Sequence, residues 1–494
     1  PAFQRTGFGI AFCLMSGIVA INQLKELLER QGVRTAWIKH LSPKQDNEKN
    51  QIYLGGALDG VTNIFPATIH ARSPSESTTK RRSKTGKPKL EARLDFAWLS
   101  PDGNRHDAPG TTIIDYFQYP EVRMSGFLKG CDDPPDTLRR DHQAQYGKRI
   151  LVMGTASDGK VVGLVLTEQD DPLVPDFPDL PLAGGRGVLH ILSIDGQAGK
   201  DPAELIRQEI ETIVSGGWYS SRIKKGDTIE PFKGSQGGGY TLEALLGVAA
   251  NGDKKPDKHG YEIKGYSGSR ISLMTPVPDY GYQGIHTFRE FMEQYGLPGQ
   301  KGDGSLRFTG LYRSGKPNAK TGFVLRVAGY DRVKDSFGDI ADIGVELFDP
   351  ENGAIVAGWS VEKMANCWNA KHANALYLNF ESRDIAGGVK DYRYASDWVT
   401  GSGTDVWKLL RAVDTGLVFY DPAHTIYSDG KAKVRPQWRI NAAALPEAMR
   451  VLYSSSEIHT VSSPPTENLN ALPSRNSEQR ESTVSKGNLS FPFI

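Results

Sequence analysis

The sequence has few cysteines, no long apolar run and almost no net charge. Its three cysteines, Cys13, Cys131 and Cys367, lie far apart and form no Cys-x-x-Cys pair. This spacing argues against a disulfide framework or a zinc site and is typical of the reducing cytoplasm. No stretch approaches the roughly 20 apolar residues that a membrane-spanning helix needs. We therefore expect a cytoplasmic protein with no membrane partner.

The near-neutral charge also limits how the chain could bind nucleic acid. There are 59 Lys and Arg against 58 Asp and Glu, a net charge of +1. Any DNA contact must therefore come from local clusters of basic residues. With 494 residues, of which 38% are hydrophobic, the chain is globular in composition and long enough for two or three domains.

Composition changes along the chain predict a β-rich first part followed by an α/β part. The Ser/Lys/Arg-rich segment 72–90 is expected to be a disordered loop. A strand at 188–194 could belong to either side of the acidic, Pro-dense segment that precedes it. The regions that we predict are a β-rich part at 1–170, a linker with a connecting strand at 171–200, an α/β part at 201–454 and a disordered tail at 455–494.

The most informative stretch is 237–275, GGGYTLEALLGVAANGDKKPDKHGYEIKGYSGSRISLMT. Thr241 is positioned to cap a short helix that places Glu243 on its first turn and ends at Gly247. Asp257 follows a proline at the start of an extended segment. The string YEIKG then alternates, so its two charged side chains are expected on one face of a strand.

Two carboxylates and an ammonium group that converge at one strand are suited to hydrolysing a phosphodiester bond. Asp257 and Glu262 offer hard oxygen ligands for Mg²⁺, with the carbonyl of Ile263 as a further ligand. Lys264 would position or deprotonate the attacking water and offset charge on the phosphorane. Glu243 could bind a second ion or hold a bound water. We expect one or two Mg²⁺ ions, with Mn²⁺ as a substitute.

The string D-x(4)-E-x-K alone is weak support, because charged residues often fall at such spacings by chance. Its surroundings, however, resemble the PD-(D/E)xK nucleases and, within them, the MvaI/BcnI restriction endonuclease family. That family shows the same order of a Gly-rich lead, a T-L-E-x-x-L-G helix, an Asn-containing loop, P-D, G-x-E-[IL]-K and a Ser/Thr-rich strand. The family's active-site residues fall on Glu243, Asp257, Glu262 and Lys264.

This resemblance implies an α/β (α+β) PD-(D/E)xK nuclease core with a mixed sheet, and a magnesium-dependent DNA hydrolase. Mismatch-repair endonucleases of the MutH type share a similar core motif. The motif therefore predicts the chemistry better than the biological role.

Several basic segments after the catalytic strand are candidates for DNA contact. The string KAKVRPQWRI alternates, so its Arg and Gln side chains should share a strand face, and Arg to guanine and Gln to adenine are favoured pairings. The alternative is a surface strand with solvated arginines. The candidate residues are Arg313, Lys316, Lys320, Lys371, His372, Arg435, Gln437 and Arg439.

The amino-terminal part has a second resemblance, to the effector domain of EcoRII-type restriction enzymes. That domain is a DNA-binding pseudobarrel with two arms, which here would be the 39–51 loop and 123–129. The first arm keeps only part of the usual pattern, and an unrelated β-rich module is the alternative. The DNA-contacting residues implied are Lys39, Lys44, Asn47, Gln51, Arg123 and Lys129.

The sequence thus favours a site-specific, Type II-like restriction endonuclease that breaks both strands of duplex DNA. The alternative is a nicking or partner-activated effector nuclease of repair or phage defence, working with accessory defence proteins. A third reading is a DNA-binding protein with a decayed nuclease fold, but the intact carboxylates and lysine count against it. The recognition sequence and the choice between monomer and dimer stay open.

Overall fold

The computed structural model describes most of the chain in twelve segments. They are residues 17–42, 50–56, 58–62, 64–72, 90–116, 121–139, 142–182, 188–194, 202–250, 256–299, 302–385 and 387–461.

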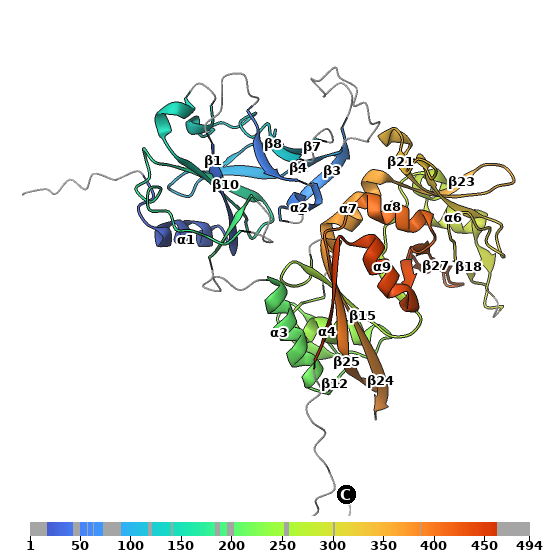
Figure 1. The fold of residues 1–494 in the computed structure, drawn as a ribbon. Helices are drawn as coiled ribbons and strands as arrows, with labels where there is room; N and C mark the ends of the chain where they lie inside the picture. The colour runs from blue at the N-terminus through green and yellow to red at the C-terminus, as the bar shows by residue number, and fades with distance from the viewer. Residues whose placement is uncertain are drawn as a thin grey trace, which may run out of the picture.

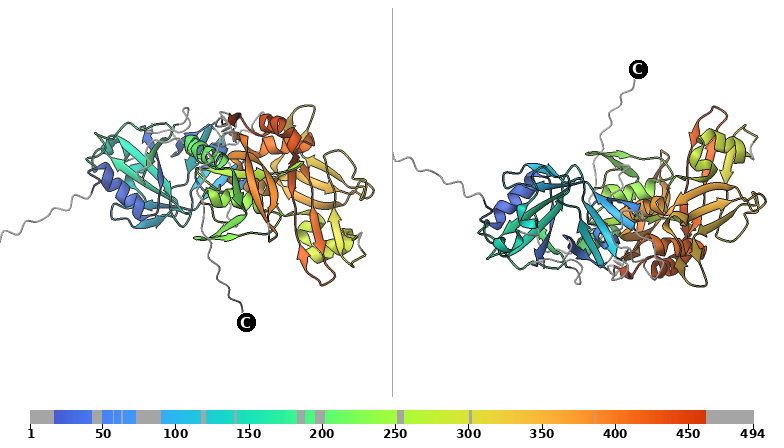
Figure 2. Two further views of the ribbon diagram at one scale, coloured as in Figure 1. Left: turned by 90° about the horizontal axis from the view of Figure 1, so that it is seen from below. Right: turned by 90° about the horizontal axis from the view of Figure 1, so that it is seen from above.

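The amino-terminal part contains two sheets, which lie at one end of the elongated molecule (Figures 1 and 2). The six-stranded sheet has the order β11-β1-β9-β10-β5-β6 and the five-stranded sheet the order β2-β8-β7-β4-β3. Strands β9 and β10 are β-branched and aliphatic runs that are buried along most of their length, as expected for the centre of a sheet. The bounds are α1(Ile21–Arg30), β1(Thr35–Leu41), β2(Ile52–Gly55), α2(Leu58–Thr62), β3(Ala67–Ala71), β4(Leu90–Leu94), β5(Phe96–Leu99), β6(Arg105–Asp107), β7(Thr112–Tyr116), β8(Glu121–Ser125), β9(Arg149–Thr155), β10(Val161–Thr167) and β11(His190–Ser193).

Strand β11 answers a question that the sequence left open. It pairs antiparallel with β1, with Ile191 opposite Trp37. The strand that follows the acidic, Pro-rich segment therefore belongs to the amino-terminal sheet. The pseudobarrel form expected for this part remains a prediction.

A third sheet carries the nuclease motif. Its order is β12-β25-β24-β15, and β30 pairs with the second half of β25, on the edge that β12 occupies at the first half. Strand β15 runs parallel to β24 while the other pairs are antiparallel, so the expected mixed sheet is confirmed. The bounds are α3(Pro202–Ser215), β12(Trp218–Ser220), β13(Arg222–Lys225), β14(Thr228–Pro231), α4(Gly237–Leu245), β15(Tyr261–Tyr266), β24(Asn374–Ile385), β25(Val389–Ser402) and β30(Ser455–Thr460).

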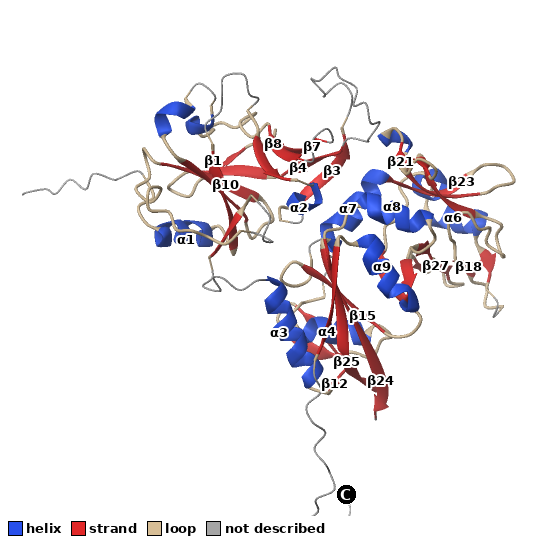
Figure 3. Ribbon diagram, viewed as in Figure 1, coloured by secondary structure: helices blue, strands red, loops and turns tan. Residues whose placement is uncertain are grey.

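Helices cover both faces of this sheet, as Figure 3 shows. Helix α3 buries Ile206, Ile210 and Ile213, spaced as one helical face, in a cluster with α4 and the sheet. Helices α7 (Val361–His372) and α9 (Leu445–Leu452) pack on the other face, beside Tyr377.

The remaining elements form a lobe at the far end of the molecule (Figure 2). It is built from short antiparallel sheets with the orders β16-β29-β26, β17-β18-β27-β28 and β19-β22-β23, and the hairpin β20-β21. The bounds are β16(Arg270–Met274), α5(Gly281–Ile285), α6(Phe288–Tyr295), β17(Leu297–Pro298), β18(Leu306–Thr309), β19(Val324–Ala328), β20(Tyr330–Asp331), β21(Ser336–Phe337), β22(Gly344–Phe348), β23(Ile355–Ser360), α8(Val406–Asp414), β26(Phe419–Tyr420), β27(Ala423–Ile426), β28(Ala432–Lys433) and β29(Trp438–Asn441).

Two sequence expectations are affected by these bounds. Residues 455–460 were placed in a disordered tail, but they form β30 because Ser455 to Thr460 pair with β25. The basic segment 73–89 and residues beyond 461 lie outside the described part of the chain. Among the described helices, none is both long and apolar enough to cross a membrane.

Candidate active site

The four side chains expected to carry the chemistry line one cleft. Glu243 comes from α4, Asp257 from the turn before β15, and Glu262 and Lys264 from β15 itself. The cleft has a volume of about 420 Å³. The prediction that these four residues lie together is confirmed, although they come from three different parts of the local fold.

The alternation of β15 places its charged side chains on one face. Ile263 packs into the cluster formed with α3 and α4, so its neighbours point to the opposite face. On that face the Nζ of Lys264 lies 2.5 Å from Oε1 of Glu262. Asp257 is tied to the same strand because its Oδ2 accepts a hydrogen bond of 2.8 Å from the backbone N–H of Ile263.

Helix α4 begins earlier than its sequence suggests. We expected Thr241 to cap it, but it starts at Gly237, and Glu243 therefore lies in its second half. The Thr241 hydroxyl instead accepts a hydrogen bond from the backbone N–H of Arg222. The early start is possible because Gly238 has no side chain: a Cβ there would lie 2.1 Å from the ring of Phe380.

Crowding and burial shift the ionisation of the carboxylates. Burial, reinforced by the nearby charge of Asp257, raises the pKa of Glu243 to about 7. Burial and the charge of Glu262 likewise raise the pKa of Asp257. Burial also opposes ionisation of Glu262, but the neighbouring bases, Lys264 foremost, outweigh it and leave its pKa lowered. One carboxylate of the cleft is thus held ionised while the other two resist losing a proton.

These carboxylates fit a divalent cation. Within the described residues, no three His, Cys, Asp or Glu side chains are gathered closely enough to enclose a metal ion. However, Oε2 of Glu262 is buried without any hydrogen-bond partner. A hard cation would satisfy this oxygen and offset the burial and the carboxylate repulsion that raise the pKa of Glu243 and of Asp257. Asp257, Glu262 and the carbonyl of Ile263 would hold it.

A second lysine, Lys371, also lines the cleft. Its Nζ lies 3.7 Å from Oε2 of Glu262, and its side chain is 31% exposed. We expected Lys371 among the DNA contacts, but the last turn of α7 directs it at the carboxylates. The sequence contains no local signal for this position, because α7 and β15 are far apart along the chain.

Part of the chain matches a known protein family. Residues 207–449 match the sequence model of the MvaI/BcnI restriction endonuclease family. This part of the chain belongs to that family. The matched segment contains all five charged residues of the cleft. The family consists of restriction endonucleases, so the chain is a deoxyribonuclease, an enzyme that cleaves DNA.

Two solved structures are similar to the same half of the chain. One is described as "Restriction endonuclease MvaI-cognate DNA substrate complex", with 22% identity, 53% of this chain and 99% of that chain covered, and a TM-score of 0.38. The other is "Restriction endonuclease MvaI in the absence of DNA", with 18% identity, 53% and 100% covered, and a TM-score of 0.29. A search of curated proteins finds no match.

Within the restriction endonuclease segment, His372 does not fulfil its expected role. It is fully buried, stacks on Trp368 with ring centroids 4.0 Å apart, and its Nε2 lies 3.1 Å from the carbonyl of Leu273. Burial lowers the pKa of His372 to about 3, so the imidazole is neutral. A neutral side chain without exposed surface cannot contact DNA, and the expectation is wrong.

The segment 431–440 was expected to form one strand, but it is divided between β28 and β29, and residues 434–437 belong to neither. The predicted alternation is present only in the burial of its side chains. Arg435, Gln437 and Arg439 are partly exposed while the residues between them are buried. Arg439 is held by Asp421 at 3.0 Å and by the Gln437 side chain at 2.7 Å. The Arg435 guanidinium has no partner among the described residues, although its backbone N–H donates to Nδ1 of His424.

The loop 313–320 divides into a structural and an exposed part. The Arg313 guanidinium stacks 4.0 Å from the centroid of Phe419 and donates to the carbonyl of Gly416. Lys316 and Lys320 are exposed. Only these two lysines are therefore freely presented to a phosphate backbone.

In the amino-terminal part, the structure describes the second expected arm and only the two ends of the first. Lys44 and Asn47 lie outside the described residues, whereas Gln51 is buried. Lys39 lies 5.6 Å from the ring of Tyr53, and burial lowers its pKa. Arg123 pairs with Glu121 at 3.0 Å, and Lys129 is exposed in a turn.

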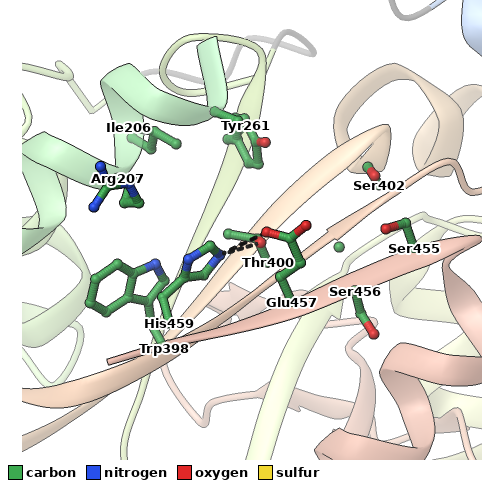
Figure 4. A pocket seen from close by; sticks show the side chains of 12 residues that line it. Ile206, Arg207, Tyr261, Trp398, Thr400, Ser402, Ser455, Ser456, Glu457 and His459 are labelled. Atoms are coloured by element: carbon green, nitrogen blue, oxygen red, sulfur yellow. Dashed lines mark hydrogen bonds and ion pairs between the residues drawn. The ribbon is translucent and has the colours of Figure 1, made fainter. Parts of the chain in front are cut away.

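A smaller cavity of about 140 Å³ lies behind β15, between α3 and the β25–β30 pair (Figure 4). His459 stacks on Trp398 with ring centroids 5.3 Å apart, and its Nε2 lies 2.8 Å from Oγ1 of Thr400. Tyr261, the first residue of β15, lines the cavity on the side of that strand. None of the five charged residues of the cleft lines this cavity.

Proposed function

We propose that this deoxyribonuclease is a magnesium-dependent, Type II-like restriction endonuclease that hydrolyses both strands of duplex DNA at a specific site. The observation that carries the proposal is the cleft itself. Three carboxylates and two lysines meet there, in a segment that belongs to a restriction endonuclease family.

Asp257, Glu262 and the carbonyl of Ile263 would bind the cation, with Glu243 as a further ligand or as the holder of a water. When bound, Mg²⁺ polarises the scissile phosphate and lowers the pKa of a coordinated water. Glu262 is suited to this task because Lys264 fixes its Oε1 and leaves its Oε2 available. The tie from Asp257 to the backbone of β15 keeps the two carboxylates in a fixed relation.

The two lysines would act on the substrate. Lys264 orients the attacking water and stabilises charge that develops on the phosphorane, while Lys371 faces the phosphate from α7. When all are ionised, three carboxylates against two ammonium groups leave one negative charge. A divalent cation together with one phosphodiester anion would balance it.

DNA would be read by the lobe that follows the catalytic strand. Arg435 is our first choice for base contact, because its guanidinium has no partner among the described residues and its side chain, like those of Gln437 and Arg439, is partly exposed. Asp421 would hold Arg439 in a fixed orientation. Lys316 and Lys320 would contact phosphates. In the amino-terminal part, Lys39, Arg123 and Lys129 remain the candidates for a second contact with DNA.

The first prediction concerns cleavage by single-residue variants. Asp257→Ala and Lys264→Ala should abolish cleavage of plasmid DNA in Mg²⁺, because one removes a cation ligand and the other the water-orienting ammonium group. DNA binding in Ca²⁺ should remain, since Ca²⁺ occupies carboxylate sites but activates water poorly. Cleavage is followed on agarose gels and binding by gel shift.

The exposed residues Glu351 and Lys334 supply matched controls, and Glu351→Ala and Lys334→Ala should cleave as the unaltered protein does. Unchanged cleavage by Asp257→Ala or Lys264→Ala at saturating Mg²⁺ would contradict the assignment of these residues to the active site.

The pattern of DNA products distinguishes the alternative functions. Discrete fragments indicate a restriction enzyme, relaxed circles indicate nicking, and a smear indicates an effector nuclease.

A further inference from the structure

Helix α7 connects the amino-terminal part to the active site. Its first half lies against β3 and α2, as Figure 1 shows, and its last turn presents Lys371 to the cleft. These two contacts are on one helix of twelve residues. A displacement at one end is therefore transmitted to the other.

Two side chains of α7 form hydrogen bonds with the backbone of β3. Oδ1 of Asn366 accepts from the backbone N–H of Ile69 at 2.8 Å, and its Nδ2 donates to the carbonyl of the same residue at 2.9 Å. Oε1 of Glu362 accepts from the N–H of Ala71 at 2.5 Å. Since β3 is the last strand of its sheet, these side chains take the place of a neighbouring strand.

These hydrogen bonds determine where α7 lies along β3 more than they determine whether α7 forms. Met364, Ala365 and Trp368 are fully buried on the nuclease side of α7 and hold it there by packing. Apolar packing is not directional, whereas an amide that both donates to and accepts from one residue permits a single alignment. Asn366 therefore sets where α7 lies along β3.

At the other end, the last turn is held rigidly. Trp368 donates a hydrogen bond of 2.8 Å from its Nε1 to the Thr404 hydroxyl, and the buried ring of His372 stacks upon it. Lys371 projects from this turn with its Nζ 3.7 Å from Oε2 of Glu262. Asn366 and Lys371 are five residues apart, about 7.5 Å along the helix axis.

We propose that Asn366 and Glu362 are positioning residues for DNA cleavage, because their hydrogen bonds to β3 place Lys371 at Glu262. The amino-terminal part thereby completes the active site instead of only adding a DNA contact. This inference rests on the proposed function, in which Lys371 faces the scissile phosphate.

The second prediction is a double-mutant cycle in the full chain. Supercoiled plasmid in Mg²⁺ is cleaved at enzyme excess, so that the single-turnover rate is measured. Asn366→Ala should lower this rate by about 10- to 100-fold, the cost of a misplaced active-site group. In a Lys371→Ala background, the same change should alter the rate by less than about twofold, because the group it positions is gone. Lys363→Ala, on the same helix, is the control and should leave the rate unchanged.

Hydrogen exchange gives a readout that does not depend on activity. The amides of Ile69 and Ala71 should exchange faster in Asn366→Ala and Glu362→Ala, respectively, while DNA binding in Ca²⁺ stays the same. If Asn366→Ala fails to fold, Glu362→Ala takes its place in the double-mutant cycle with Lys371→Ala.

Two results would overturn the inference. One is a rate loss that is equally large with and without Lys371, because Asn366 would then act by another route. The other is faster exchange at Ile69 with an unchanged cleavage rate. Failure of the proposed function looks different: the unaltered chain would not cleave, or Asp257→Ala would cleave normally.

Discussion

Glu262 lies among the basic side chains of the cleft and its surroundings. Lys264 holds one of its oxygens, Lys371 faces the other, and the buried His372 lies behind it on α7. Burial alone would favour the protonated carboxyl, but the neighbouring bases lower its pKa. The group therefore stays ionised in a buried position, which a ligand of a hard cation requires.

Single residues also mark the limit of what the sequence reveals about the site. Glu262 and Lys264 could be predicted because they alternate within one strand. Lys371 and His372 are adjacent, yet one faces the cleft and the other the core, because consecutive helical residues point about 100° apart. The four-residue spacing from Trp368 to His372 could have indicated that His372 packs on Trp368, because residues four apart lie on the same face of a helix.

The third prediction is that acid weakens the fold through His424. This ring is fully buried in the lobe, where its Nδ1 accepts from the N–H of Arg435 and its Nε2 lies 3.1 Å from the Tyr420 hydroxyl. Burial lowers the pKa of His424 to about 4, whereas an unfolded histidine has a pKa of about 6.5. The unfolded chain therefore takes up the proton first, and stability is lost as the pH falls from 6.5 toward 4.

The free energy of unfolding should fall by up to about 1.4 kcal/mol per pH unit more in the unaltered protein than in His424→Gln, which does not titrate. Urea denaturation at pH 6.5 and 4.5 measures this difference. Equal losses in the two proteins would show that His424 does not contribute.

At the scale of elements, α4 depends on glycines that look unfavourable for a helix. The sequence predicts its end at Gly247, where φ is +77°, but not its start, because Gly237 to Gly239 have low helix propensity. Packing against β24 and β25 outweighs that propensity, and such contacts between distant segments leave no local trace in the sequence. The hydrogen bonds of α7 to β3 were missed for the same reason.

The fourth prediction compares two adjacent glycines of α4. In Gly238→Ala the new Cβ would meet the Phe380 ring, and we expect a loss of about 1–3 kcal/mol in stability. In Gly239→Ala nothing lies within 4 Å of the Cβ, and we expect a gain of about 0.5–1 kcal/mol from the higher helix propensity. Chemical denaturation of both variants is the test. A loss in Gly239→Ala, or none in Gly238→Ala, would contradict the packing described for α4.

At the scale of the whole molecule, the parts predicted from composition are more closely joined than expected. The buried side chains of the five-stranded sheet and those around α7 form one continuous cluster, which includes Ile69 and Trp368. The strand at 190–193 belongs to the amino-terminal sheet, so that part extends beyond residue 170. Composition shows where polarity changes along a chain, but it does not show which apolar surfaces meet.

The fifth prediction concerns β30. A chain that ends at residue 454 lacks this strand and exposes the backbone N–H and C=O groups of β25 from Asp397 to Ser402. Exposed strand edges pair with other chains, so we expect association that increases with protein concentration. A chain that ends at residue 461 retains β30 and is the control. Light scattering should distinguish the two, and equal scattering would contradict the expectation.

The parallel pairing of β15 with β24 has a consequence for how the enzyme is made. Tyr261 pairs with Asn374, and Lys371 lies on α7, which follows β15 by about a hundred residues. A growing polypeptide that already contains the three carboxylates of the cleft therefore still lacks α7 and β24, which support them. Domains generally fold as they leave the ribosome, in order from the amino terminus. Until α7 and β24 have been synthesised, the unfinished protein has no assembled cleft with which to damage the DNA of its own cell.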